Sequence, residues 1–319
     1  MAKEKFEDRK LTGAINVCCK FDDGSIKWWR TRKEDVVANI ISIVDEYAAE
    51  GYILTLRQLH YQFVGHVEGF INHITAYKKL GDIVDDCRYS GTIDWGAIED
   101  RGRVPYIPYS VNSVEHALQD TIDQYRLDRQ EGQSNHVELW SEKDALAGIL
   151  RRSTEKYHIQ LIINKGYSSS SAMYSAYNRI LNNSLHEGMT TILYFGDHDP
   201  SGLDMVRDIS ERLTFMIEQG EYHLVASDIF QIIQIGLTMQ QIKKYKLPPN
   251  PTKLTDSRSD KYIAKFGKTC WEVDALKPQV LTSIIESHIQ QQIDVEKYKE
   301  MVTREKGDIE ELENFIRTR

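Results

Sequence analysis

The sequence predicts an α/β protein in which a helical N-terminal domain precedes a domain built on a parallel sheet. Residues 31–91 carry apolar side chains at helical spacing behind repeated capping signals. From residue 136 onward, short β-prone segments alternate with amphipathic ones. Such alternation is typical of parallel strands whose faces are covered by helices. Since the chain has 319 residues, more than one typical domain, we expect two.

Composition limits the classes of function. The chain begins with a charged stretch and contains no apolar run of about 18 residues, so we expect a cytoplasmic protein with no membrane segment. Its four cysteines match neither a zinc-ligand spacing nor a disulfide framework. A formal net charge of -8 argues against a broadly basic surface. Any contact with nucleic acid must therefore be local.

Three helices and a short strand are expected in the first domain. A capping box at residues 31–34 opens a helix that continues to Gly51, and a second box at residues 55–58 opens a shorter one. A third helix runs from about residue 75 to residue 89, and β-prone residues 92–95 follow it. Ahead of them, residues 26–29 are either a short strand or a packing anchor.

This order resembles a winged helix-turn-helix, and the alternative is a generic small helical bundle. In a winged helix-turn-helix the third helix enters a DNA groove. Lys78 and Lys79, near the start of that helix, are therefore candidate DNA-binding residues.

Tyr61 stands out on the second helix. At about 100° per residue it lies roughly 140° from the centre of the helix's apolar stripe, and Arg57 shares its face. An arginine can hold a phosphate in a fork and favour the phenolate that attacks it. Tyr61 and Arg57 are thus candidate catalytic residues. The alternative is an interface or surface tyrosine, in a chain that has 17 of them.

The second domain follows a linker at residues 109–135 that contains one helix. Prolines precede that helix, and polar, turn-forming residues follow it. Beyond the linker we expect strands at residues 137–140, 159–163 and 191–195, with helices at 144–156, 169–181 and 203–217.

Three carboxylates follow two of these strands. Glu142 comes after the first strand, and Asp197 and Asp199 come after the third, at the sheet edge where ligands bind in open parallel sheets. Two residues apart in extended backbone, the aspartates point the same way and can share one ion. Oxygen ligands favour Mg2+. The alternatives are a solvated acidic turn for the pair and an ordinary helix-start acid for Glu142.

One segment concentrates positive charge. Residues 243–268 contain eight basic side chains and two acidic ones, so we expect this segment to contact phosphates. The basic residues are Lys243, Lys244, Lys246, Lys253, Arg258, Lys261, Lys265 and Lys268.

Together these motifs resemble a known family. The Ser141-Glu-Lys-Asp-Ala145 strand exit and the Gly196-Asp-His-Asp-Pro-Ser-Gly202 loop resemble the Glu and Asp-x-Asp motifs of a Toprim domain. The variant is that of the A subunit of topoisomerase VI and its meiotic double-strand-break relatives. Arg57-Gln-Leu-His-Tyr61 resembles that family's Arg-x-x-Tyr-Tyr, with His60 in place of the first tyrosine. Cys270-Trp-Glu-Val-Asp-Ala-Leu276 resembles its late Glu-rich segment.

The resemblance covers roughly residues 33–300 and implies a division of the chain. An N-terminal extension (1–30) precedes a winged-helix domain (31–108), the linker (109–135) and a Toprim domain with a C-terminal helical extension (136–319).

The resemblance also implies an activity, namely Mg2+-dependent cleavage of double-stranded DNA by transesterification. Tyr61 would form a 5′-phosphotyrosyl link, with Arg57 and Glu142 as further catalytic residues and Glu142, Asp197 and Asp199 around the metal. A homodimer would cut both strands. Since the chain has no Walker A motif, strand passage would need a separate ATPase (B-type) subunit, unless the chain is a stand-alone member. The alternatives are a Toprim nuclease that uses water, and a non-enzymatic DNA-binding component of a larger complex.

Overall fold

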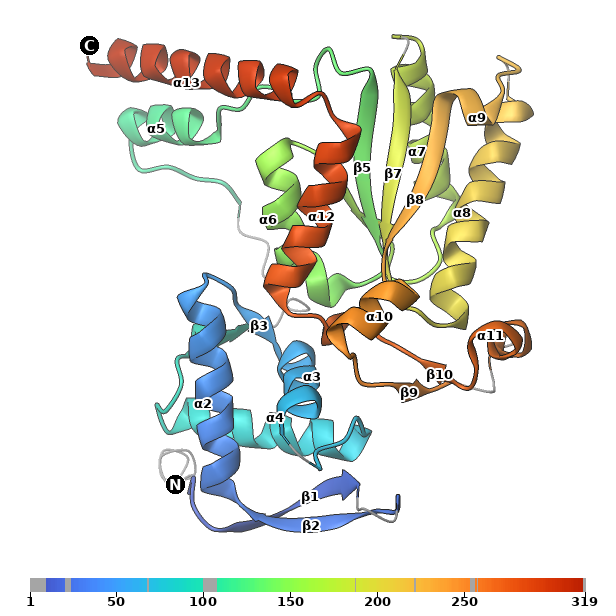
Figure 1. The fold of residues 1–319 in the computed structure, drawn as a ribbon. Coiled ribbons are helices and arrows are strands. Elements are labelled where there is room, and N and C mark those ends of the chain that lie inside the picture. The colour runs from blue at the N-terminus through green and yellow to red at the C-terminus, as the bar shows by residue number, and fades with distance from the viewer. Residues whose placement is uncertain are drawn as a thin grey trace. The chain divides into compact units, whose positions relative to one another are not determined.

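The computed structural model describes residues 10–20, 24–67, 69–99, 108–186, 188–220, 222–252, 256 and 258–317. It is a mixed α/β structure with a four-stranded parallel sheet, as the sequence predicts (Figure 1). Among these residues, no helix is both long and apolar enough to cross a membrane.

The chain forms two compact units. The first consists of Met1–Val104, Asp197–Pro200 and Leu237–Pro278, and the second of Pro105–Gly196, Ser201–Gly236 and Gln279–Arg319. The first unit thus includes two segments that the sequence-based division placed after residue 136. Those two segments carry the acidic loop and the basic region.

The second unit is organised around its sheet. The strands are β5 (Asn135–Ser141), β6 (Gln160–Ile163), β7 (Met189–Phe195) and β8 (Phe230–Gly236). They are all parallel and lie in the order β6-β5-β7-β8. The first three lie where the sequence predicts strands, whereas β8 was not foreseen.

Helices cover this sheet because their apolar residues recur on one face. From α8, Met205, Ile209 and Leu213 pack into one core cluster with Ile192 and Tyr194 of β7. The helices of the second unit are α5 (Val114–Gln124), α6 (Ala147–Tyr157), α7 (Ser170–Ser184), α8 (Pro200–Glu218), α9 (Ala226–Ile229), α12 (Pro278–Gln292) and α13 (Val295–Arg317). Of these, α5 and α13 pack against each other. A 3-10 turn, η3 (Asp144–Leu146), leads into α6.

In the first unit, three helices pack around one apolar core: α2 (Lys33–Ala49), α3 (Leu56–His66) and α4 (Ile74–Tyr89). The capping box predicted at Thr55 is present and opens α3. The box predicted at Thr31 is absent, because Arg32 is the N-cap of α2 and its side chain makes no capping bond.

Short strands complete the first unit. β1 (Ala14–Lys20) and β2 (Ile26–Arg32) form an antiparallel hairpin, and β3 (Leu54–Thr55) pairs in parallel with β4 (Ile98–Glu99). The strand predicted at residues 92–95 is wrong, because a 3-10 turn, η1 (Trp95–Ala97), begins there and the strand follows it.

Residues 237–278 add smaller elements to the first unit. β9 (Asn250–Pro251) pairs antiparallel with β10 (Thr269–Cys270). The helices are α10 (Met239–Tyr245) and α11 (Ser259–Phe266), and the 3-10 turn η4 (Val273–Ala275) follows β10.

Candidate active site

Tyr61 is buried among polar groups. The Thr55 side chain accepts from the backbone nitrogen of Gln58, which fixes the start of α3 and hence the direction of its faces. Tyr61 is only 4% exposed, yet it lies outside the apolar cluster that contains Leu59 and Phe63. Its position therefore has to be explained by hydrogen bonds and charge.

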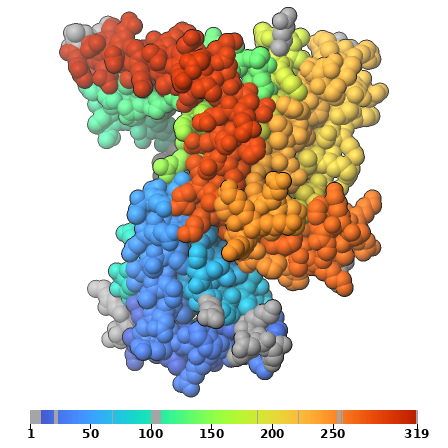
Figure 2. Space-filling model, viewed as in Figure 1, coloured from blue at the N-terminus to red at the C-terminus, as the bar shows by residue number. Residues whose placement is uncertain are grey.

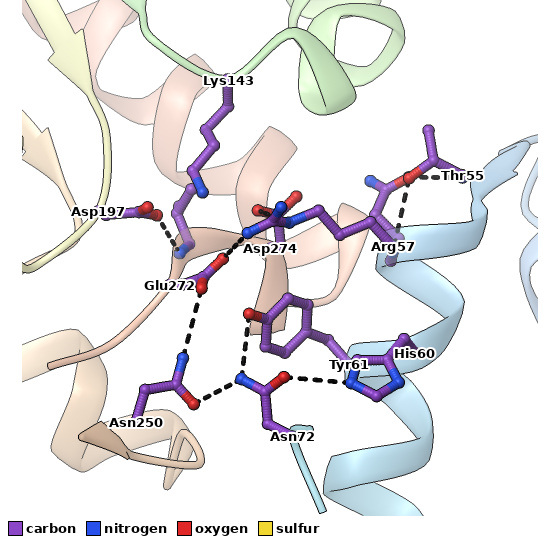
Figure 3. A network of polar contacts seen from close by, with 12 residues as sticks. Thr55, Arg57, His60, Tyr61, Asn72, Lys143, Asp197, Asn250, Glu272 and Asp274 are labelled. Carbon is purple, nitrogen blue, oxygen red and sulfur yellow. Dashed lines mark hydrogen bonds and ion pairs between the residues drawn. The ribbon is translucent and has the colours of Figure 1, made fainter. Parts of the chain in front are cut away.

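A chain of amide side chains holds the Tyr61 hydroxyl (Figure 3). Asn72 Nδ2 donates to Tyr61 Oη at 3.2 Å and to Asn250 Oδ1 at 2.6 Å. Asn72 Oδ1 lies 3.1 Å from His60 Nε2, and Asn250 Nδ2 donates to Glu272 Oε1 at 3.4 Å. Residues from α3, the loop before α4, β9 and the segment after β10 thus meet around one phenol.

Arg57 supplies the positive charge of this network. Its guanidinium forms an ion pair with Glu272 and lies 3.5 Å from Asp274 Oδ2. The Asp274 side chain is fully buried, whereas that of Arg57 is 47% exposed. The guanidinium carbon also lies 6.0 Å from the centre of the Tyr61 ring. The guanidinium of Arg57 therefore pairs with two carboxylates and lies near the Tyr61 ring, while about half of the side chain is exposed.

The electrostatics of the network keep Tyr61 protonated. Burial raises the pKa of the phenol, and the charge and hydrogen bond of Glu272 act in the same direction. Arg57 favours the phenolate, as expected from the sequence, but its effect on the Tyr61 pKa is outweighed. Burial would lower the pKa of Arg57 itself, but Asp274 and Glu272 raise it, so Arg57 is charged. Burial also lowers the pKa of His60.

The acidic loop joins the same region of the first unit. Asp197 Oδ1 accepts a hydrogen bond of 2.9 Å from the backbone nitrogen of Val273. The backbones of His198 and Trp271 exchange two hydrogen bonds, and His198 Nδ1 lies 2.8 Å from Tyr262 Oη. Residues 271–274 are therefore the common support of the acidic loop and of Arg57.

Glu142 belongs to the second unit, whereas Asp197 and Asp199 belong to the first. It follows β5 directly and is half-buried. Ser141 at the end of β5 pairs with Phe195 at the end of β7, so both loops leave the same edge of the parallel sheet. β5 and β7 are thus neighbouring parallel strands, as the sequence predicts for the sheet.

Asp197 and Asp199 suit a hard cation. No three His, Cys, Asp or Glu side chains in the described part of the chain are gathered so that they could hold a metal ion. Mg2+, however, is usually bound by one or two carboxylates together with waters and substrate phosphates. Asp197 and Asp199 supply carboxylates of this kind, and one oxygen of Asp197 already accepts a hydrogen bond from the Val273 backbone.

The candidate DNA-binding lysines lie on helices of the first unit. Lys78 is exposed and Lys79 half-buried on α4, while Lys243, Lys244 and Lys246 are all exposed at the end of α10.

In the rest of the basic segment, Lys261, Lys265 and Lys268 are exposed as well. Arg258 forms an ion pair with Asp256, its Nε lying 2.8 Å from Oδ1, so part of its charge is neutralised within the chain. Lys253 lies outside the described residues.

Several residues of the site were not foreseen. Asn72 and Asn250 carry the network, and Tyr262 holds His198, but none of them stands in a spacing that marks a site. Glu272 and Asp274 had one signal, the late acidic segment at residues 270–276.

Comparisons with known proteins add no further information about the site. No protein-family model, curated protein or solved structure matches the chain.

Proposed function

We propose that the protein cleaves double-stranded DNA by transesterification, with Tyr61 as the nucleophile. The observation that carries this proposal lies within the first unit. Arg57, which shares a helix face with Tyr61, pairs with Glu272 and Asp274. Val273, which lies between these two acids in the sequence, donates a backbone hydrogen bond to Asp197. Phosphoryl transfer to a tyrosine requires the tyrosine itself, a positive charge and acidic groups. Here one short segment, residues 271–274, supports both the arginine and the acidic loop.

The reaction can be written from these side chains. Tyr61 Oη attacks a backbone phosphorus, the bond from phosphorus to the 3′-oxygen breaks, and the phosphate stays on the tyrosine through the 5′ side. The departing 3′-oxygen takes up a proton and leaves as a hydroxyl. Glu272 is the carboxylate hydrogen-bonded to the phenol and is therefore the group placed to accept the Tyr61 proton.

Arg57 would bind the attacked phosphate. Its guanidinium is held by Glu272 and Asp274, and the Arg57 side chain is 47% exposed. A phosphate that replaces Glu272 on Arg57 leaves that carboxylate available to the phenol proton. Substrate binding and activation of Tyr61 would then be coupled through one ion pair.

Mg2+ bound to Asp197 and Asp199 would neutralise charge on the phosphate. Glu142 keeps its proposed part, as acid/base or further metal ligand, on the strength of the sequence motif alone. The exposed Lys78, Lys243, Lys244 and Lys246 are the groups we propose for the duplex backbone, with Lys79 and Arg258 beside them.

The resemblance extends the proposal to fold and partners. Helices α2 to α4 with strands β3 and β4 are compatible with a winged helix, and β5 to β8 with a Toprim sheet. A homodimer and a separate ATPase subunit are the partners that the family resemblance adds.

A second candidate is a metal-dependent nuclease that uses water. The observation that favours it is the burial of Tyr61 together with its raised pKa, because a protonated phenol is a poor nucleophile. In this case Tyr61 supports the network, and the metal activates the water.

Trapping on DNA separates these candidates. Full-length protein is incubated with internally labelled duplex, with and without Mg2+, and the reaction is stopped with denaturant. We expect Mg2+-dependent label that migrates with the protein and free 3′-hydroxyl ends. Cleaved DNA with protein-free 5′-phosphate ends would instead establish the water mechanism. If the protein binds the duplex but does not cleave it, the remaining interpretation is a non-enzymatic DNA-binding component of a larger complex.

A further inference from the structure

The β1–β2 hairpin presents aromatic and basic side chains to solvent. Six of the seven residues of β2 are exposed, including Ile26 at 59% and Trp28 at 60%. The hairpin lies at the surface of the first unit, where it is coloured dark blue in Figure 2. The network around Tyr61 described above is formed by residues outside this hairpin.

Strand register shows which side chains share the open face. Val17, Cys18 and Cys19 of β1 are all buried in the core of the first unit, and their partners across the hairpin are Trp29, Trp28 and Lys27. Because successive residues of a strand point to opposite faces, Trp28 and Arg30 lie on the face away from Val17. Trp28 shares its face with the buried Cys18 and is still the more exposed of the two indoles, at 60% against 39% for Trp29.

The chemistry of this face is cationic and aromatic. The segment Ile26–Arg32 contains three basic residues and no acid, and Arg32 pairs with Glu34 at 3.3 Å. Lysine is depleted at the centre of protein interfaces, whereas arginine and tryptophan are enriched there. Alternating aromatic and basic side chains are typical of surfaces that stack bases and contact the phosphate backbone.

The exposed indole also discriminates between forms of nucleic acid. Base faces in a duplex are already stacked on one another, so a flat aromatic side chain gains most from bases that are unpaired. We propose that the open face of β2 binds single-stranded nucleic acid, with Trp28 stacking on a base and Arg30 contacting a phosphate. This site is separate from the duplex-cleaving site proposed above and does not depend on it.

The test measures binding of full-length protein to a fluorescent oligothymidine by anisotropy, without Mg2+. Trp28→Ala should weaken binding roughly tenfold or more, and Trp28→Phe should restore part of it. Arg30→Ala should reduce the slope of log affinity against log salt by about 0.7. Phe215→Ala is the matched control, because Phe215 is 68% exposed on α8, away from the hairpin in the sequence, and its loss should change neither quantity.

Two results would overturn the proposal. One is oligothymidine binding by Trp28→Ala that equals binding by wild type. The other is a change in sedimentation mass on Trp28→Ala with unchanged oligothymidine affinity, which would make the face a protein contact. Trapping of the covalent adduct on duplex DNA with the Trp28 and Arg30 variants is a separate readout. Variants that still form the adduct but no longer bind oligothymidine support the hairpin site. Variants that lose the adduct but still bind oligothymidine contradict it.

Discussion

The backbone nitrogen of Val273 donates a hydrogen bond of 2.9 Å to Asp197 Oδ1. Asp197 is 6% exposed, and its partner lies between Glu272 and Asp274, the two carboxylates that hold Arg57. The side chain expected from the sequence to bind a metal therefore also satisfies a buried backbone donor. Asp197 accordingly contributes to stability as well as to the proposed chemistry.

Substitutions of the two aspartates should separate these contributions. Asp197→Ala leaves the Val273 N–H without its acceptor and should lower the free energy of unfolding by about 1–3 kcal/mol. Asp197→Asn retains an acceptor oxygen and should be more stable than Asp197→Ala. Asp199 is half-buried, and Asp199→Ala should be better tolerated.

All three aspartate variants should lose Mg2+-dependent DNA cleavage, because each removes one of the two charges proposed for the metal. Urea unfolding and plasmid cleavage are the measurements. Full cleavage by Asp197→Asn and Asp199→Ala would remove both residues from the metal site.

Tyr61→Phe should abolish the covalent adduct at a modest cost in stability. It removes the oxygen that forms the phosphotyrosyl bond, together with its hydrogen bonds with Asn72 and Glu272, each worth on the order of 1 kcal/mol. Tyr47→Phe is the matched control. Tyr47 is 1% exposed, and its hydroxyl has no hydrogen-bond partner among the described residues, so its loss should be neutral or stabilising. An adduct that persists in Tyr61→Phe would assign the nucleophile elsewhere.

Short sequence motifs predicted a helix or strand correctly where pairing with another segment does not favour a different structure. The capping box at Thr55 and the apolar runs of β5 and β7 lie where the sequence predicts them. The box at Thr31 failed for a physical reason. Thr31 pairs with Ile15 in the hairpin, which keeps Thr31 in strand, so that Arg32 is the N-cap and α2 begins at Lys33.

The site shows the same limit. The spacing of Arg57 and Tyr61 predicts a shared helix face, and the guanidinium carbon is indeed 6.0 Å from the ring centre. Their partners Asn72, Asn250 and Glu272 come from 11 to 215 residues away along the chain. No periodicity relates such positions, so sequence alone could not place the network or reveal that it buries Tyr61.

Arg57→Ala should destabilise the protein more than loss of a surface pair. It leaves Glu272 and the buried Asp274 without their counter-charge. Since Arg57 is half open to solvent, we expect a loss of more than about 1 kcal/mol but less than the 3–5 kcal/mol of a fully buried pair. Lys277→Ala, which breaks an exposed pair with Glu46, is the control and should cost at most about 1 kcal/mol.

A double variant tests the cause of that loss. Arg57→Ala combined with Asp274→Asn removes the buried negative charge and should recover part of the stability in urea unfolding. Failure to recover any of it would mean that the packing of Arg57, and not its charge, supports the network.

The Cys87 thiol should resist alkylation near neutral pH. Burial on α4 raises the pKa of this thiol from 9.0 to about 11, so little thiolate forms below pH 10. The folded protein then binds more protons than the unfolded chain between pH 9 and pH 11. The contribution of Cys87 to stability is therefore complete below pH 9 and is lost as the pH rises through 11.

Iodoacetamide labelling followed by mass spectrometry checks the Cys87 prediction, with unfolded protein as the reference. Labelling of Cys87 in folded protein at pH 8 as fast as in urea would contradict it.

Lys243, Lys244 and Lys246 should contribute to DNA affinity without sequence preference. All three are exposed at the end of α10, so their ammonium groups can approach backbone phosphates. Replacing the three with Gln should weaken duplex binding equally for different sequences. It should also reduce the salt slope by about 0.9 for each phosphate that the variant no longer neutralises.

A matched triple variant controls for net charge in this experiment. Lys297, Lys299 and Lys306 are exposed on α13, and their replacement by Gln changes the charge by the same amount. Affinity and salt slope of the α13 variant should stay near those of wild type, since a local interaction depends on where the charge lies and not on its total. Equal losses of DNA affinity in both triple variants would show that the α10 lysines act only through the overall electric field of the protein. The DNA backbone would then contact another part of the surface.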